Sequence, residues 1–285
     1  MLKNQIIKAT AMDGTIRLII SKTTQLVEEA RERHEMSPVG TVALGRLLTG
    51  GAMMGAMLKD EAESITLKIK GDGELNGLVV TANPKAEVRG YVYNPQAQTY
   101  ITEKGKIDVG KSIGNGTLSV TKDLGFGEPI TGQTALVSGE IGEDLTAYFA
   151  ISEQTPSAVA VGVHINSDNH VDHAGGFLLQ LMPDVEEENI VILEHILSTV
   201  DPITTMMAHG LQPEDILHQV FGVLNPQILE TIEPQFVCHC SRDKMQDMLT
   251  SLDANEVNEW KKEGIPVEVV CDYCNSHYVF EVGEL

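Results

Sequence analysis

Positive charge is scarce in this chain and unevenly placed. Its 285 residues include 20 Lys and Arg against 41 Asp and Glu, which gives a formal net charge of −21. No Lys or Arg occurs between Lys122 and Arg242, although that interval holds 18 acidic residues. Phosphate backbones and anionic lipids are bound through clustered cations. The composition therefore predicts no nucleic-acid partner and no membrane partner.

Long hydrophobic runs are also lacking. Lys8, Asp13 and Arg17 interrupt the N-terminal segment, so it has no continuous apolar stretch of the kind found in secretory signals. Residues 38–58 carry one charge, Arg46, and only just reach the length of a membrane span. Their five glycines and modest hydrophobicity favour a helix buried in a domain core, where glycine permits close approach. We expect a cytoplasmic protein.

Residues 1–177 are predicted to form an α+β domain with a mostly antiparallel sheet. The dipeptide Ser37-Pro38 is typical of a helix start, and Thr24 is expected to cap a helix that ends near His34. Apolar and polar residues alternate over 65–70, which is the period of a half-buried strand. Strands that follow one another through short turns favour antiparallel pairing. Further strands are expected at 16–20, 75–82, 88–93, 117–122 and 158–165.

Residues 178–237 are predicted to form a helical connector. They contain ten acidic residues and no basic ones. Asp184 and Glu187 have the spacing of a capping box, and Pro213 takes the first position of a second amphipathic helix. The apolar faces of these helices need a cover, and we expect the C-terminal module to supply it.

Residues 238–285 are predicted to form a small separate module. Ser241 can cap one helix, and a second short helix should hold Val257 and Trp260 and stop at Gly264. Two strands then follow, one on each side of the last two cysteines.

Cysteine is absent from the first 237 residues. All four cysteines lie in the module, as Cys238-His-Cys240 and Cys271-Asp-Tyr-Cys274, with 30 residues between the pairs. Zinc binds four ligands in a tetrahedron, and two closely spaced pairs can supply them. The spacing predicts one structural zinc ion held by Cys238, Cys240, Cys271 and Cys274, with no open position for catalysis.

The small size of the module supports the metal interpretation. A core this small seldom suffices, and metals or disulfides usually compensate. Structural disulfides would suit a secreted chain. A thioredoxin-like C-x-x-C would open a helix, whereas Cys274 precedes an expected strand. His239 and His277 lie near enough in sequence to be substitute ligands, but four available cysteines make them bystanders.

The predicted site also has the chemistry of a redox switch. Zinc-bound cysteines remain reactive thiolates. An oxidant can convert one of them to a sulfenic acid, which a neighbouring thiolate resolves to a disulfide. Disulfides cannot hold zinc, so oxidation would release the ion and unfold the module.

Two other groups of residues could have a functional role. His164, His170 and His173, with neighbouring aspartates Asp168 and Asp172, could form a second metal site. The composition of their segment is that of a turn, and we favour a polar turn. The methionines of 53–57 could form an adaptable binding surface, but we favour core packing.

Five segments together resemble the heat shock protein 33 family of redox-regulated holdase chaperones, over essentially the full length of the chain. The most specific of them is the C-x-C-S…C-x-x-C arrangement. His239 stands where that family usually has arginine, which leaves the four ligands intact. The other segments are Leu48-Thr-Gly-Gly-Ala-Met-Met-Gly-Ala-Met-Leu58, Gly71-Asp-Gly73 with Gly77-Leu-Val-Val80, Tyr148-Phe-Ala-Ile-Ser-Glu-Gln-Thr-Pro-Ser157 and Gly175-Gly-Phe-Leu-Leu-Gln180.

The resemblance implies a cytoplasmic protein that is inactive when reduced and zinc-bound, and that is not an enzyme. Oxidants would form the Cys238–Cys240 and Cys271–Cys274 disulfides and release zinc. The module and connector would then lose structure, and the protein would dimerise and hold unfolding client proteins without ATP. Two rivals remain open: a zinc-ribbon nucleic-acid binder, which needs more cations than the module has, and a thiol–disulfide oxidoreductase, which would turn over disulfide substrates.

Overall fold

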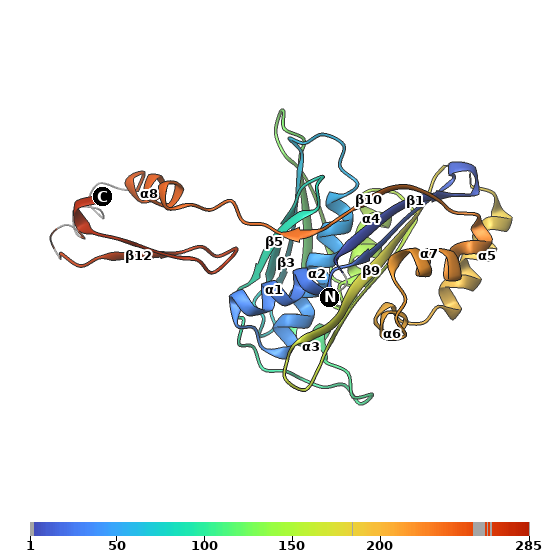
Figure 1. Cartoon of the computed structure of the whole chain (residues 1–285), viewed down its shortest axis with the longest axis horizontal. Helices are drawn as coiled ribbons and strands as arrows, with labels where there is room; N and C mark the ends of the chain where they lie inside the picture. The colour runs from blue at the N-terminus through green and yellow to red at the C-terminus, as the bar shows by residue number, and fades with distance from the viewer. Residues whose placement is uncertain (1–2, 184, 253–259, 261, 263, 285) are drawn as a thin grey trace. The chain divides into compact units, whose positions relative to one another are not determined.

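The computed structural model describes residues 3–183, 185–252, 260, 262 and 264–284. The chain divides into two compact units, Met1–Phe236 and Val237–Leu285. The first unit holds two mainly antiparallel sheets with helices, and the second holds a two-stranded hairpin with a helix (Figure 1). The predicted α+β class is confirmed.

One five-stranded sheet, sheet A, has the strand order β10-β1-β2-β9-β8, with every neighbouring pair antiparallel. Its central strand β2 is buried on both faces, because Ile19 and its neighbours Leu18 and Ile20 are all inaccessible to solvent. Helices must therefore cover both sides of this sheet. The strands are β1 (Gln5–Ala11), β2 (Ile16–Lys22), β8 (Ser157–Ile165), β9 (Val171–Leu181) and β10 (Gln227–Ile232).

The six-stranded sheet, sheet B, has the order β11-β5-β4-β3-β6-β7, and only β11 runs parallel to its neighbour. In β3 the side chains of Ile65, Leu67 and Ile69 are buried and the residues between them are not, as the alternation predicts. The strands are β3 (Ser64–Gly71), β4 (Leu78–Ala82), β5 (Glu87–Val92), β6 (Gly116–Asp123), β7 (Ile130–Ala135) and β11 (Gln235–Phe236).

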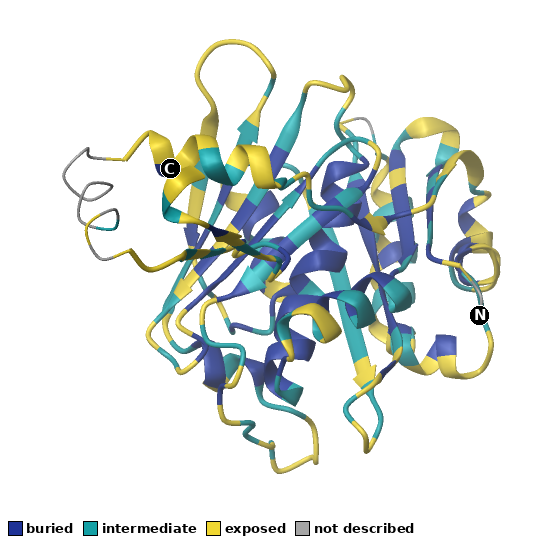
Figure 2. Ribbon diagram, turned by 60° about the vertical axis from the view of Figure 1, so that its left-hand side comes forward, coloured by how far each residue is buried: buried dark blue, intermediate teal, exposed yellow. Residues whose placement is uncertain are grey.

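Helix α2 (Pro38–Gly55) contacts strands of both sheets and lies between them (Figure 1). The hydroxyl of Ser37 caps it by accepting a hydrogen bond from the Gly40 N–H at 3.3 Å. Every residue of the helix except Pro38 and Arg46 is buried, which confirms the buried-helix interpretation (Figure 2). Among the described residues, no helix combines the length and apolar character that a bilayer span requires.

The glycines of α2 permit the close approach that the sequence predicts. A Cβ on Gly45 would lie 2.5 Å from Val27 Cγ1, and one on Gly51 would lie 2.6 Å from Val80 Cγ1. Real Cβ atoms do not come so close to neighbours, so larger residues would push the packed layers apart. Met53 and Met54 are buried in the same helix, as expected for core packing.

The remaining helices of the two-sheet body are α1 (Thr24–His34), α3 (Val109–Ile113) and α4 (Gly142–Ile151), with a 3₁₀ turn η1 (Met12–Gly14). The predicted N-cap of helix α1 is wrong by one residue. The N-cap position belongs to Thr23, and Thr24 is already helical. The hydroxyl of Thr24 instead accepts a hydrogen bond from the Ala174 N–H at 3.1 Å, which ties α1 to β9.

The segment 178–237 is helical only in its middle part. Helices α5 (Glu187–Thr199), α6 (Ile203–Ala208) and α7 (Pro213–Phe221) confirm the expected helices, and Pro213 opens α7 as predicted. A 3₁₀ turn, η2 (Gly222–Leu224), follows. The helical prediction is wrong for 178–181, 227–232 and 235–236, which are strand residues of β9, β10 and β11. Asp184 lies outside the described residues, and Glu186 takes the N-cap position of α5.

The apolar faces of these helices pack against sheet A. A single buried cluster joins β1, β2 and β9 to α5, α6, α7 and η2. The expectation that the C-terminal module covers these faces is therefore wrong, because the outer face of sheet A supplies the cover. The buried members of this outer cluster are Ile7, Ala9, Ala11, Ile16, Leu18, Ile20, Phe177, Leu179, Leu193, Ile203, Met206, Met207, Ile216, Leu217, Phe221 and Leu224.

The second unit contains α8 (Arg242–Thr250), the antiparallel pair β12 (Val267–Val270) and β13 (His277–Phe280), and a 3₁₀ turn, η3 (Val282–Glu284). Ser241 caps α8 by accepting a hydrogen bond from the Lys244 N–H, and the two strands lie where the sequence places them. The predicted helix through Val257 and Trp260 falls mostly on 253–259, 261 and 263, outside the described residues.

Candidate metal centre

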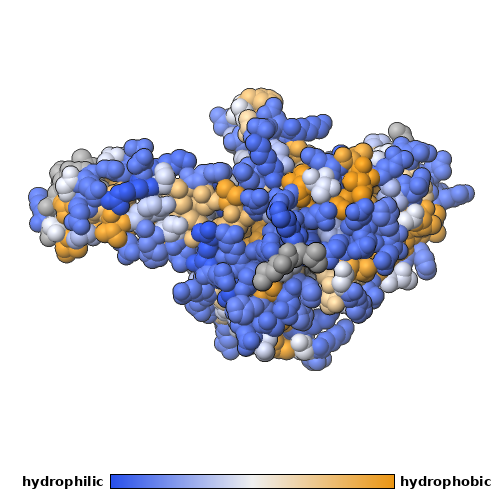
Figure 3. Space-filling view, in the orientation of Figure 1, coloured by the Kyte–Doolittle hydropathy of each residue, from blue (hydrophilic) through white to orange (hydrophobic). Residues whose placement is uncertain are grey.

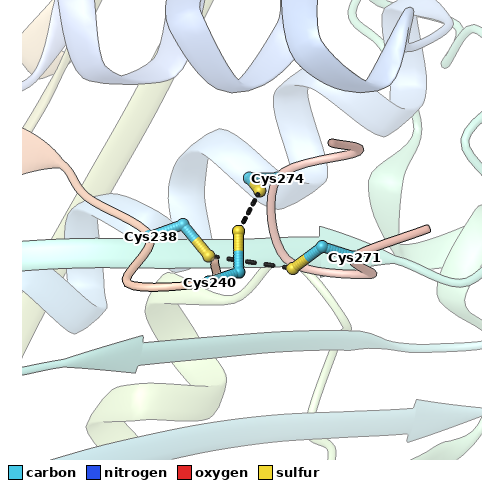
Figure 4. A group of neighbouring side chains, drawn as sticks. All are labelled: Cys238, Cys240, Cys271 and Cys274. Atoms are coloured by element: carbon cyan, nitrogen blue, oxygen red, sulfur yellow. Dashed lines mark hydrogen bonds between the residues drawn. The ribbon is translucent and has the colours of Figure 1, made fainter. Parts of the chain in front are cut away.

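The four cysteines converge from two segments of the second unit. Cys238 and Cys240 lie in the stretch between β11 and α8, and Cys271 and Cys274 lie in the loop between β12 and β13. All four sulfur atoms lie within 4.8 Å of one another and point toward a common centre (Figure 4). Cys238 Sγ is 3.8 Å from Cys271 Sγ, and Cys240 Sγ is 3.3 Å from Cys274 Sγ.

These separations suit a tetrahedral metal ion. Zinc–sulfur bonds of about 2.3 Å place the four ligands of a tetrahedron about 3.8 Å apart. The observed sulfurs scatter around that spacing and are much too far apart for disulfide bonds, which are about 2.05 Å long. All four cysteines are free. The four side chains can therefore hold one metal ion, and an all-sulfur set is a typical structural zinc site.

Backbone hydrogen bonds build the half-site that contains Cys271 and Cys274. The Cys271 carbonyl accepts hydrogen bonds from the N–H groups of Cys274 at 3.3 Å and Asn275 at 2.8 Å, and the Cys271 N–H donates to the Ser276 carbonyl at 2.9 Å. Asn275 takes a left-handed conformation with φ of 56°. The resulting tight turn aims both sulfurs to the same side.

The environment separates the acidities of the two thiols in this turn. Burial raises the pKa of Cys271 to about 12. Burial also opposes ionisation of Cys274, but hydrogen bonds from the Ser276 side chain, Cys240 and the Ser276 backbone outweigh it and lower the pKa to about 7. Metal binding would need both sulfurs as thiolates, so it would release protons at neutral pH.

Two hydroxyl groups border the sulfurs, and neither was predicted as part of the site. Tyr278 Oη donates a hydrogen bond to Cys240 Sγ at 3.2 Å, and Ser276 Oγ lies 3.2 Å from Cys274 Sγ. Both residues follow Cys274 within four positions. A search for hydroxyl groups in the four residues after the last cysteine would have found them.

The unit around the sulfurs has a very small core. Among its described residues, only Leu249, Cys271, Cys274 and Phe280 are buried. The Arg242 guanidinium carbon lies 4.4 Å from the centre of the Phe280 ring, and the same side chain donates two hydrogen bonds to the Glu284 carboxylate at 2.8 and 2.9 Å. Two of the four buried residues are cysteines, so the sulfurs are themselves part of the core.

The histidines do not join the sulfur group. His277 Nδ1 lies 2.7 Å from Glu268 Oε1, and neither His239 nor His277 is a member of the four-sulfur set. Of the histidines weighed for a second site, His164 and His173 lie in strands β8 and β9, and His170 lies in the turn between them.

A second group of possible ligands in the described chain consists of Glu28, Glu32 and His170. It is not the predicted histidine trio, because His170 Nδ1 lies 2.7 Å from Glu28 Oε1 on α1. Arg31 also donates to both oxygens of Glu28 at 2.8 Å. A guanidinium already neutralises this carboxylate, so the group has the arrangement of an ion-pair network.

Comparison with known proteins places the chain in a family. The family model described as Hsp33 protein matches residues 4–281. The chain belongs to the Hsp33 family. It is 44% identical to a 33 kDa chaperonin of Bacillus cytotoxicus over 285 residues, covering 100% of this chain and 98% of that one. It is 46% identical to a 33 kDa chaperonin of a Geobacillus species, with 100% and 96% coverage.

A solved Hsp33 structure has the same fold. The crystal structure of the 33 kDa chaperonin (heat shock protein 33 homolog) from Thermotoga maritima superposes with a TM-score of 0.92 at 39% sequence identity. The match covers 99% of this chain and 96% of the Thermotoga chain. Membership in the Hsp33 family supports a chaperone function.

Proposed function

We propose that this protein is a redox-regulated, ATP-independent holdase chaperone whose reduced, zinc-bound form is inactive. The observation that carries the proposal is the group of four sulfurs within 4.8 Å of one another in a unit whose described core has only four buried residues. Such a unit depends on its cross-link, so chemistry at the sulfurs controls whether it stays folded.

Cys238, Cys240, Cys271 and Cys274 would hold one zinc ion, which supplies a structural cross-link and keeps the sulfurs as thiolates. Structural zinc contributes on the order of 10–16 kcal/mol in finger-sized peptides. Whole domains are stable by only about 5–15 kcal/mol. Loss of the ion would therefore unfold residues 238–285.

Oxidation by peroxide begins when a cysteine sulfur attacks one peroxide oxygen. The O–O bond breaks, the sulfur becomes a sulfenic acid and hydroxide leaves. A second thiolate then attacks that sulfur, a disulfide forms and another hydroxide leaves. We propose Cys238–Cys240 and Cys271–Cys274 as the final disulfides. The sulfur contacts of 3.8 and 3.3 Å cross between these pairs, so the sulfurs would have to rearrange to form these disulfides.

Client binding would follow from loss of structure in 178–237 after the module 238–285 unfolds. Helices α5, α6 and α7 pack against the members of the outer cluster that lie on sheet A, and their departure would expose large apolar side chains from β1, β2 and β9. The face of the folded chain drawn in Figure 3 is largely hydrophilic, with separate apolar patches. Unfolding client proteins would bind the newly exposed face, and the oxidised protein would form a homodimer in the cytoplasm.

The deciding experiment follows two signals in one sample. The purified reduced chain is treated with hydrogen peroxide in the presence of a denatured client, and zinc release and client aggregation are recorded together. We expect one zinc per chain to be released, with suppression of aggregation that scales with the amount of chaperone. Zinc release without suppression of aggregation would contradict the proposal. Turnover of a disulfide substrate would also contradict it and would favour the oxidoreductase alternative.

A further inference from the structure

The two halves of the cysteine cluster have hydroxyl neighbours from different parts of the unit. In the C-x-x-C half, Ser276 Oγ lies 3.2 Å from Cys274 Sγ. Ser276 belongs to the tight turn itself, because its carbonyl accepts a hydrogen bond from the Cys271 N–H. The C-x-C half has one residue between its cysteines, which is too short for the same turn. Its Cys240 sulfur receives its hydroxyl hydrogen bond from a side chain across the unit, Tyr278.

The hairpin holds Tyr278 in place for this role. Tyr278 lies opposite Val269 in the β12–β13 ladder, and this pairing fixes the part of the backbone that carries the ring. Residues two apart in a strand share a face, so Tyr278 and the fully buried Phe280 lie on the same side of β13. Phe280 is itself held by the Arg242 guanidinium. The phenolic oxygen is thereby kept 3.2 Å from Cys240 Sγ.

We propose that Tyr278 is a positioning residue that slows oxidation of Cys240, and so sets how much oxidant the switch tolerates before it opens. This inference rests on the proposed zinc-bound, redox-regulated function. The Tyr278 O–H donates to the thiolate and draws electron density from the lone pair that would attack peroxide. Removing the donor leaves a more electron-rich sulfur, which breaks the O–O bond of peroxide faster and passes to sulfenic acid sooner.

The size of the effect follows from thiolate chemistry. Thiolate nucleophilicity changes by about threefold for each tenfold change in basicity. Hydrogen-bonding partners of metal ligands also affect the metal itself, typically by about 10- to 100-fold in affinity. A single lost phenolic hydrogen bond should therefore give a modest rate change in a site that still fills with zinc.

The test uses the full-length, reduced and zinc-loaded chain with the substitution Tyr278→Phe, which removes the hydroxyl and keeps the ring. Zinc release after peroxide is followed with a chromogenic chelator, and oxidation at each cysteine is mapped by mass spectrometry at early times. We expect release about threefold faster than in the unsubstituted chain, with the gain in early oxidation concentrated on Cys240. A purely structural role would accelerate all four cysteines alike.

Tyr100→Phe is the matched control, because it removes a phenolic hydrogen bond to Glu74 at 2.5 Å in the first unit, far along the chain from the cysteines. It should release zinc at the original rate. An unchanged rate in Tyr278→Phe would overturn the inference. So would loss of zinc from that variant before oxidant is added, since Tyr278 would then be needed to build the site. Absence of zinc from the unsubstituted chain would instead overturn the proposed function.

Discussion

The rings of Phe177 and Phe221 meet edge to face, with their centroids 5.6 Å apart. Phe177 lies on β9 in sheet A, and Phe221 ends helix α7. Both are almost completely buried. This contact joins the two-sheet body to the segment that we propose to lose structure on oxidation, so it opposes exposure of the outer cluster.

Shortening the Phe221 side chain should weaken the contact between α7 and sheet A. Phe→Ala substitutions in cores cost about 3–5 kcal/mol, and here the loss falls on the packing of α7 against sheet A. We expect Phe221→Ala to raise amide hydrogen exchange in 203–221 and to suppress client aggregation even when reduced. Val223→Ala, at an exposed neighbouring position, should do neither. A reduced Phe221→Ala protein that exchanges faster but holds no client would show that this face is not the client surface.

Replacing one sulfur should remove the metal and the fold of the module together. Cys271→Ser leaves three cysteines and exchanges a buried thiol for a hydroxyl that zinc binds poorly. We expect zinc content to fall from one per chain toward zero, and the amides of 267–270 and 277–280 to lose protection from exchange. Asp272→Asn changes an exposed neighbour and should keep both. Retained protection without zinc would refute the view that the ion holds the module together.

Protonation of Glu28 should make the first unit less stable in acid. Burial opposes its ionisation, but hydrogen bonds from Arg31, His170 and the Val171 N–H outweigh burial and lower the pKa from 4.5 to about 2. Because the folded pKa is depressed, the stabilisation is complete above the unfolded value of 4.5 and is lost as pH falls toward 2. Its size should be about 2 kcal/mol after allowance for solvent screening.

Urea unfolding of Glu28→Gln between pH 2 and 7 tests this expectation. The variant should be less stable than the unsubstituted chain at neutral pH, and the two should converge in acid. Glu29→Gln removes a more exposed carboxylate of the same helix, which pairs with Arg33. It should keep the pH dependence that Glu28 supplies. Parallel curves for Glu28→Gln and the unsubstituted chain would contradict the role of this carboxylate.

Gly45 should tolerate no side chain without cost. An added Cβ would lie 2.5 Å from Val27 Cγ1 and 2.9 Å from Val163 Cγ2. We expect Gly45→Ala to destabilise the chain by about 1–3 kcal/mol through overpacking, measured by urea unfolding. Gly222→Ala has no neighbouring heavy atom within 4 Å of the new Cβ and should be close to neutral. Equal stability of the two variants would mean that α2 can shift without penalty.

Local patterns in the sequence predicted much of the fold. The cap and proline at Ser37 and Pro38 place the start of α2, and the alternation in 65–70 predicts β3, because both signals act within a few residues. Strand β10 was missed for a physical reason. Every residue of β10 except Ile232 is exposed, so it carries no amphipathic pattern. Its partner in the sheet lies at the other end of the sequence.

The metal centre was similarly predictable in part. Cysteine spacing alone indicates the four sulfurs, because zinc sites are built from close pairs. Tyr278 could not be assigned in that way, because its contact with Cys240 depends on the register of the β12–β13 hairpin. The sequence predicted the wrong partner for the apolar faces of α5, α6 and α7. An apolar helix face indicates that a partner exists, but not which one.

The pairing of β1 with β10 also bears on how the protein is made. Lys8 and Glu230 are opposite each other in the sheet and form an ion pair at 2.9 Å, although they are 222 positions apart. Ribosomes add about 5–20 residues per second, so β1 waits on the order of ten seconds or more for its outer neighbour. During synthesis one edge of sheet A therefore stays unpaired, and an unpaired strand edge can pair with other chains and aggregate.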